Sequence, residues 1–150
     1  MSLDVDMMRR CLELARGAAE RGEVPVGALI CRDGRIVAEA SNRREADDDP
    51  TAHAERLAIT DAGRALGTWR LEGCTLYATL EPCPMCAGAI VQARIARVVY
   101  GAADPKAGAC RSLYRLADDP RLNHRAAIEG GVLAAECGAI LSTFFASRRR

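Results

Sequence analysis

Residue types that bind zinc occur in this sequence at spacings that can build one metal site. His53 and Glu55 frame the short motif HAE, and Cys83 and Cys86 lie three positions apart in the motif PCPMC. Imidazole and thiolate are preferred zinc ligands, and two cysteines at this spacing share one face of a helix. We therefore predict that His53, Cys83 and Cys86 hold a zinc ion, with Glu55 beside it.

The number of ligands favours a catalytic rather than a structural site. One imidazole and two thiolates make three ligands, whereas zinc prefers four, so one position stays open for water. Zinc lowers the pKa of a bound water towards about 7, which makes a nucleophile available at neutral pH. Glu55 is then the candidate group that moves protons during the reaction.

Two other interpretations of the cysteine pair stay open. A C-x-x-C motif between a strand and a helix also fits a thioredoxin-like redox site, but that reading gives the HAE motif no role. A structural zinc site needs a fourth ligand. The candidates for it, none with a matching spacing, are Cys74, Cys110, Cys137 and His124. The joint occurrence of H-x-E and P-C-x-x-C favours the catalytic site.

The ligands must be carried by two helices that begin near one another. The pattern predicts one helix over 51–66, with Thr51 or Asp49 as its N-cap, and another from Pro82 to about residue 94. The partial positive charge of a helix N-terminus stabilises thiolates. We therefore expect two helix N-termini to converge on one metal.

The rest of the pattern alternates helices with strands. A helix is expected over 4–22, a hairpin over 24–41 with its turn at Asp33-Gly34, and a final helix over 132–149 that Gly138 could break. The other expected segments are strands within 71–80, over 95–100 and over 126–129, and loops over 42–50 and 101–120, with a short helix at 112–116. This alternation indicates one α/β layered domain spanning residues 1–150.

Composition excludes several classes of protein. The chain has 150 residues, 49% of them hydrophobic and 27% charged. Its seven cysteines are odd in number and spread along the chain, which argues against a secreted disulfide scaffold. No apolar run approaches the ~18 residues of a membrane span, and the N-terminus lacks the apolar centre of a secretory signal. We expect a cytoplasmic protein without a membrane partner. The net charge of +1 means that nucleic-acid binding would need local basic patches.

Further motifs along nearly the whole chain resemble the bacterial tRNA adenosine deaminases. They are EVPVGA from residue 23, DPTAHAE from 49, TLEPC from 79, MCAGA from 85, GAAD from 101, LNHR from 122 and FF from 144. The first and last are weak alone, but the set is specific. Cys110-Arg111 and Pro105 depart from the family pattern in the loop that would meet the substrate.

The resemblance implies a fold, an activity and a partner. The fold would be the α/β, three-layer cytidine-deaminase-like fold, with a mixed five-stranded sheet between helices. The activity would be hydrolytic deamination of adenosine to inosine at the wobble position of a tRNA anticodon stem-loop, by a zinc-dependent homodimer. A deaminase of free bases or nucleosides, of the guanine or cytosine type, stays the alternative because it would use the same zinc residues.

The resemblance also implies contacts to the RNA. Asn42 would hydrogen-bond the flipped base or its ribose, and Val26 and Ala54 would line a dry base pocket. Asp104 and Lys106 would lie in the loop that holds neighbouring nucleotides. The basic end of the chain would lie near phosphates through Arg148, Arg149 and Arg150. From the residues alone, the Asp104 segment also fits a solvated turn, and the three arginines fit a basic chain end.

Overall fold

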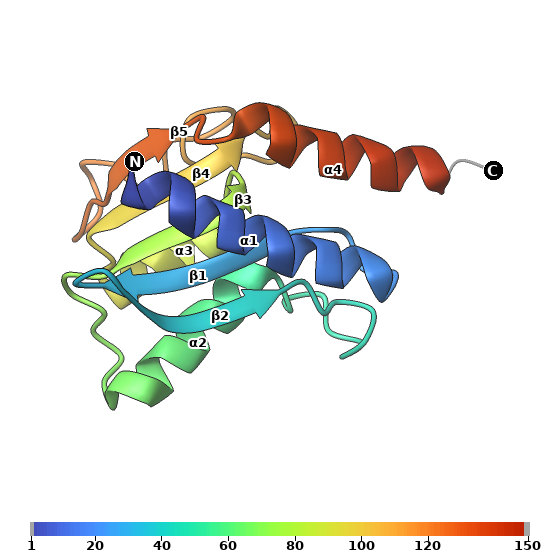
Figure 1. Ribbon diagram of the computed structural model, residues 1–150. Coiled ribbons are helices and arrows are strands. Elements are labelled where there is room, and N and C mark those ends of the chain that lie inside the picture. The colour runs from blue at the N-terminus through green and yellow to red at the C-terminus, as the bar shows by residue number, and fades with distance from the viewer. Residues whose placement is uncertain (1, 149–150) are drawn as a thin grey trace.

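The computed structural model describes residues 2–148, which form a mixed five-stranded sheet with helices on both faces (Figure 1). The strand order is β2-β1-β3-β4-β5. β1 is antiparallel to both β2 and β3, whereas β3, β4 and β5 run parallel. The strands are β1 (Gly27–Arg32), β2 (Arg35–Ser41), β3 (Thr75–Leu80), β4 (Arg97–Ala102) and β5 (Ala127–Gly130). The expected five-stranded α/β architecture is thus confirmed.

Each face of the sheet carries a pair of helices, so the molecule has three layers (Figure 1). Successive side chains of β1 point to opposite faces of the sheet, as they do along any strand. Leu29 packs in the core that α1 and α4 cover, and Ile30 packs in the core that α2 and α3 cover. The helices are α1 (Leu3–Glu20) and α4 (Ala134–Ser147) on one face, and α2 (Ala54–Leu66) and α3 (Pro84–Ala93) on the other.

The β1–β2 hairpin turns where the sequence predicts it. Asp33 and Gly34 both have positive φ, 53° and 76°, as the two central residues of a type I′ turn require. At the other end of β1, α1 approaches so closely that a Cβ on Gly27 would lie 2.1 Å from the carbonyl oxygen of Cys11. The glycine therefore allows the helix to cross the strand beside Val26.

Helix α2 begins later than predicted. Neither Thr51 nor Asp49 is its N-cap, which is His53. The Asp49 carboxylate instead accepts hydrogen bonds from the backbone N–H and the hydroxyl of Thr51, at 2.8 and 2.7 Å. This local turn holds residues 49–52 outside the helix, because an aspartate that bonds its own backbone two residues on stabilises a turn.

Two other expectations about local structure were wrong. Residues 112–116 form a turn and an irregular stretch rather than a short helix, because the N–H of Leu116, which would bond to the carbonyl of Ser112 in a helix, donates to the carbonyl of Ala109 instead. Gly138 does not break α4, which continues through it to Ser147. The strands predicted within 71–80 and 95–100 begin at Thr75 and Arg97.

No helix within residues 2–148 combines the length and the apolar character needed to cross a membrane.

Candidate metal centre and substrate pocket

Three side chains from two helix N-termini meet at one point. His53 is the N-cap of α2, Cys83 is the N-cap of α3, and Cys86 lies in the first turn of α3. The Nδ1 atom of His53 lies 3.5 Å from the Sγ of Cys83 and 3.6 Å from the Sγ of Cys86. One ligand atom from each of the three lies within 4.8 Å of the others. The structure therefore brings together the three residues that the sequence analysis selected.

The spacing of these atoms fits a tetrahedral zinc ion. Zn–N bonds of about 2.05 Å and Zn–S bonds of about 2.3 Å at tetrahedral angles place nitrogen and sulfur about 3.6 Å apart. The two observed distances from His53 are 3.5 and 3.6 Å. Neither His53 nor Cys83 uses its side chain to cap its own helix, so both side chains are available to a metal.

The electrostatics of the two thiols suit a cation. The pKa of Cys83 is lowered to about 4, chiefly by a hydrogen bond from Cys86 and further by His53. The same contact raises the pKa of Cys86, which is fully buried. Cys83 therefore favours the thiolate form, whereas Cys86 favours the thiol form. A divalent cation among the three ligands would favour the thiolate form of both, because metal binding displaces thiol protons.

Glu55 lies beside this group and does not belong to it. It follows Ala54 in the first turn of α2, its side chain is buried, and its oxygens are not among the ligand atoms that cluster within 4.8 Å. Burial raises the pKa of Glu55 to about 7, because an ionised carboxylate is poorly solvated there. A carboxyl group with a pKa near neutrality can both accept and donate a proton.

A cavity of about 160 Å³ opens above the ligand group. Seven residues that the sequence analysis named line it: Val26, Asn42, His53, Ala54, Glu55, Cys83 and Asp104. Five lining residues were missed: Val24, Arg44, Leu80, Glu81 and Ala107. The TLEPC motif could have indicated Glu81, because a carboxylate between a buried strand and a helix start needs partners. Loop residues such as Ala107 carry no periodic signal.

Asn42 is held in the pocket wall by the chain itself. Its side-chain N–H donates to the carbonyl of Val24 at 3.2 Å, and its side-chain oxygen accepts from the N–H of Arg44 at 3.0 Å. An amide side chain has two N–H donors and an oxygen with two lone pairs. Asn42 thus keeps one donor and one acceptor for a ligand, in a fixed orientation.

Asp104 lines the pocket while it caps its own turn. One carboxylate oxygen accepts the N–H groups of Lys106 and Ala107, at 3.0 and 3.1 Å. Lys106 lies in the same turn, is exposed and does not line the cavity.

Arg148 lies next to the pocket rather than in it. Arg148 lines a neighbouring cavity of about 350 Å³ together with Asn42 and Arg44, and its guanidinium lies 4.6 Å from the centre of the Phe144 ring. Arg149 and Arg150 lie outside the described residues.

Comparison with known proteins agrees with this geometry. Residues 1–102 match the family model for the zinc-binding region of cytidine and deoxycytidylate deaminases. The tRNA-specific adenosine deaminase of Bacillus subtilis (strain 168) is 51% identical over 150 residues, which are 100% of this chain and 93% of the relative. The enzyme of the same name from Haemophilus influenzae is 49% identical over 97% of this chain and 85% of its own length. The chain therefore belongs to the cytidine and deoxycytidylate deaminase family of zinc-binding enzymes.

Solved structures extend the comparison to the fold. A structure from a study of A-to-I editing by tRNA:A34 deaminases at the wobble position superimposes with a TM-score of 0.87 at 47% identity, covering 91% of this chain and 99% of that one. Guanine deaminase from Bacillus subtilis superimposes with a TM-score of 0.64 at 35% identity, covering 97% of this chain and 93% of that one. Enzymes that act on different purines thus share this architecture.

Proposed function

We propose that this protein hydrolyses adenosine to inosine at the wobble position of a tRNA anticodon stem-loop. The observation that carries the proposal is the arrangement of the pocket. His53 and Cys83 of the three-residue metal group line the cavity, and so do Glu55, Asn42 and Asp104. Relatives at 51% and 49% identity that are tRNA-specific adenosine deaminases support the choice of substrate.

His53, Cys83 and Cys86 hold zinc in this proposal. Zinc, when bound, supplies a Lewis acid that makes water nucleophilic at neutral pH. Glu55 accepts a proton from the attacking water and delivers it to N1 of the adenine ring as the oxygen bonds to C6. Glu55 then takes the remaining proton from the hydroxyl group on C6 and passes it to the amino group, which leaves as ammonia when its bond to C6 breaks, so that inosine remains. One carboxyl group can make both transfers because N1 and the exocyclic amino nitrogen are bonded to the same carbon, C6.

The size of the pocket supports a flipped base as the ligand. Its volume of about 160 Å³ is well below the roughly 300–1,000 Å³ of sites that enclose drug-sized ligands. A single planar base fits such a space, and its ribose and neighbours then lie outside on the rim. Val26 and Ala54 supply apolar walls, and Asn42 presents its free donor and acceptor.

The rim supplies the contacts to RNA. Asp104 and Lys106 meet the nucleotides beside the target, and Arg148, Arg149 and Arg150 meet phosphates. The position of Arg148 beside Arg44 and Asn42 supports this assignment, because it puts two guanidinium-bearing residues on the cavity that adjoins the base pocket. Arginine suits phosphate because its planar fork can form two hydrogen bonds at once.

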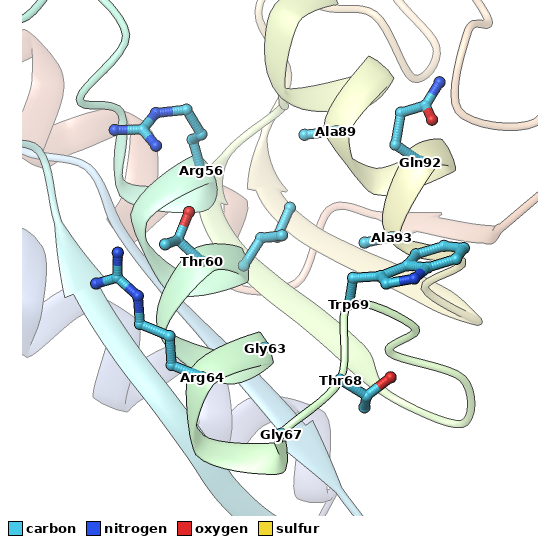
Figure 2. A pocket seen from close by; sticks show the side chains of 11 residues that line it. Arg56, Thr60, Gly63, Arg64, Gly67, Thr68, Trp69, Ala89, Gln92 and Ala93 are labelled. Carbon is cyan, nitrogen blue, oxygen red and sulfur yellow. The ribbon is translucent and has the colours of Figure 1, made fainter.

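A second copy of the chain is the proposed partner along the outer side of α2 and α3. An open groove of about 970 Å³ runs between α2 and α3, with the apolar side chain of Ile59 on its wall. Figure 2 shows Trp69 beside the end of α3 at Ala93, and 60% of its surface is exposed. A homodimer would cover this surface. Sedimentation of the purified protein and of Trp69→Glu tests this, since a dimer predicts that the variant shifts to monomer.

The proposed location is the cytoplasm, where tRNA is processed. All seven cysteines are free, and five of them outside the proposed metal site are buried. Free thiols persist in a reducing compartment.

The substrate panel is the experiment that tests the proposal. The protein is incubated with an anticodon stem-loop bearing a wobble adenosine, with the same stem-loop bearing guanosine, and with free adenosine, guanine and cytosine. Release of ammonia and formation of inosine from the first substrate alone supports the proposal. The structural likeness to guanine deaminase makes free guanine the main competitor, and ammonia from guanine without reaction of the stem-loop overturns the proposal.

A further inference from the structure

Glu81 is a buried carboxylate that the mechanism above does not use. It follows β3 directly, precedes the metal-binding turn of α3 by two residues, and is 1% exposed. Its side chain accepts five hydrogen bonds from the 104–112 loop. The donors are the N–H groups of Asp104 at 3.0 Å, Cys110 at 3.1 Å, Arg111 at 2.7 Å and Ser112 at 2.9 Å, and the hydroxyl of Ser112.

These five hydrogen bonds hold a loop that has no regular secondary structure. A buried carboxylate is costly unless donors surround it, and here every donor comes from a single loop. The buried backbone N–H groups of the loop also need an acceptor, and Glu81 supplies it. The loop closes tightly over the carboxylate, since a Cβ on Gly108 would lie 2.4 Å from both Cδ and Oε1 of Glu81.

The same loop forms one wall of the base pocket. Asp104 and Ala107 line the cavity, and the first of them is bonded to Glu81 through its own N–H. Both oxygens of Glu81 are already occupied: Oε1 accepts from Asp104 and from the Ser112 hydroxyl, and Oε2 accepts the other three N–H groups. The oxygens of Glu81 therefore bond to the loop, and the residues of the loop are the ones that can contact the substrate.

We propose that Glu81 is a positioning residue that fixes the 104–112 loop against the pocket, so that Asp104 meets the RNA in one orientation. The part of this proposal that concerns substrate binding rests on the proposed function. Its effect falls on substrate binding, because the loop carries rim contacts and neither the metal ligands nor Glu55. A residue that served the metal site through its neighbour Cys83 would instead change zinc content and turnover.

The test is Glu81→Gln, which keeps the size of the side chain. In either orientation the new amide nitrogen faces at least one backbone N–H group, so hydrogen bonds on one side of the side chain are lost. We expect exchange of the amide hydrogens of 104 and 110–112 to accelerate at least about tenfold, the equivalent of one hydrogen bond to a charged group. KM for the RNA stem-loop should rise about tenfold, with kcat within about twofold of the original and zinc content unchanged.

Two more variants keep the test decisive. Ser112→Ala removes one of the five bonds and leaves the carboxylate in place, so it should accelerate exchange and raise KM less than Glu81→Gln does; it also serves if Glu81→Gln does not fold. Tyr77→Phe is the matched control on the same strand. It removes the hydrogen bond from the Tyr77 hydroxyl to Asp4 on the other face of the sheet, and should lower stability without changing exchange in the 104–112 loop.

Three outcomes would overturn the proposal. They are unchanged exchange in the 104–112 loop of Glu81→Gln, loss of zinc in that variant, or a fall in kcat with constant KM. Amide exchange is measured without substrate. If the wild-type protein does not deaminate the RNA stem-loop, the proposed function fails while the exchange result still decides whether Glu81 fixes the loop.

Discussion

The Nδ1 atom of His53 lies 3.5 Å from the Sγ of Cys83, although 30 positions separate the two residues in the chain. Each residue occupies the N-cap position of a helix, and the two helices lie on the same face of the sheet. Two helix N-termini therefore meet end-on at one point, where their partial positive charges favour thiolates and a carboxylate. This convergence places the metal ligands and Glu55 in a single site.

Zinc content should depend on this pair. The wild-type protein should carry about one zinc per chain, and Cys83→Ala should carry almost none, because two ligands do not hold zinc at ordinary concentrations. Cys74→Ala is the control, since Cys74 is a buried thiol outside the site, whereas Cys83 is partly buried within it. Elemental analysis of the three proteins checks this. Full zinc in Cys83→Ala, or a Cys83–Cys86 disulfide in a zinc-free wild type, would contradict the assignment.

Glu55→Gln should separate catalysis from metal binding. The amide keeps the shape of the side chain and cannot take a proton from water. We expect full zinc content and a loss of turnover of roughly 10²–10⁴-fold, the usual contribution of a positioned acid or base. Zinc analysis beside single-turnover kinetics gives both readouts. Loss of zinc would make Glu55 a ligand, and unchanged turnover would remove it from the mechanism.

The sequence predicted the chemistry of the site better than its surroundings. HAE and PCPMC single out the three side chains that cluster in the structure, because zinc chemistry restricts both residue type and spacing. The start of α2 was misplaced because Thr51 bonds to Asp49 instead of beginning the helix. The helix expected at 112–116 is absent because the N–H groups of this segment bond outside it, that of Ser112 to Glu81 and that of Leu116 to the carbonyl of Ala109. Such partners leave no periodic signal in the segment itself.

The strand order and the pocket rim also lay beyond the sequence pattern. Periodicity locates β1 and β3 but does not state that they pair antiparallel at the centre of the sheet. Arg44 and Ala107 line the pocket because two loops that lie far apart in the chain meet there.

Acid should weaken the attachment of α1 to the sheet. The Asp4 carboxylate accepts two hydrogen bonds from Arg97, at 2.9 and 2.6 Å, and one from the Tyr77 hydroxyl at 2.6 Å. The bonds from Arg97 hold the pKa of Asp4 below its ordinary value. The stabilisation is therefore complete above the unfolded pKa of about 3.9 and is lost as the pH falls through the lower folded pKa.

Asp4→Asn isolates this contribution. Urea unfolding near pH 7 should show the variant less stable by about 2 kcal/mol, the scale of hydrogen bonds to a charged group. The difference should shrink as the pH falls below about 4, where the unfolded state of the wild type takes up a proton first, and should vanish below the lower pKa of the folded state, where Asp4 is protonated in both states. Comparison of the two proteins cancels other acid effects, including loss of metal. A difference that stays constant with pH would show that the charge of Asp4 is not responsible.

Asp104 should favour RNA over DNA. An ionised carboxylate only accepts hydrogen bonds and repels phosphate, whereas the ribose 2′-OH is a donor that DNA lacks. Asp104→Asn keeps an oxygen for the N–H groups of Lys106 and Ala107, so the turn should persist while the charge is removed. Deamination of one stem-loop made as RNA and as DNA should show a preference for RNA that the variant narrows by about tenfold. If the ratio of RNA to DNA deamination is the same in the variant and the wild type, Asp104 does not contact the sugar.

The origin of the oxygen atom in the product tests the central claim most directly. The wild-type protein is incubated in water enriched in ¹⁸O with an RNA anticodon stem-loop that bears a wobble adenosine, and the product is digested to nucleosides for mass spectrometry. Hydrolytic deamination in the pocket of Glu55 predicts inosine at the wobble position alone, with one ¹⁸O at C6 and one ammonia released for each inosine. An intact wobble adenosine, with ammonia released instead from free guanine, would contradict the account.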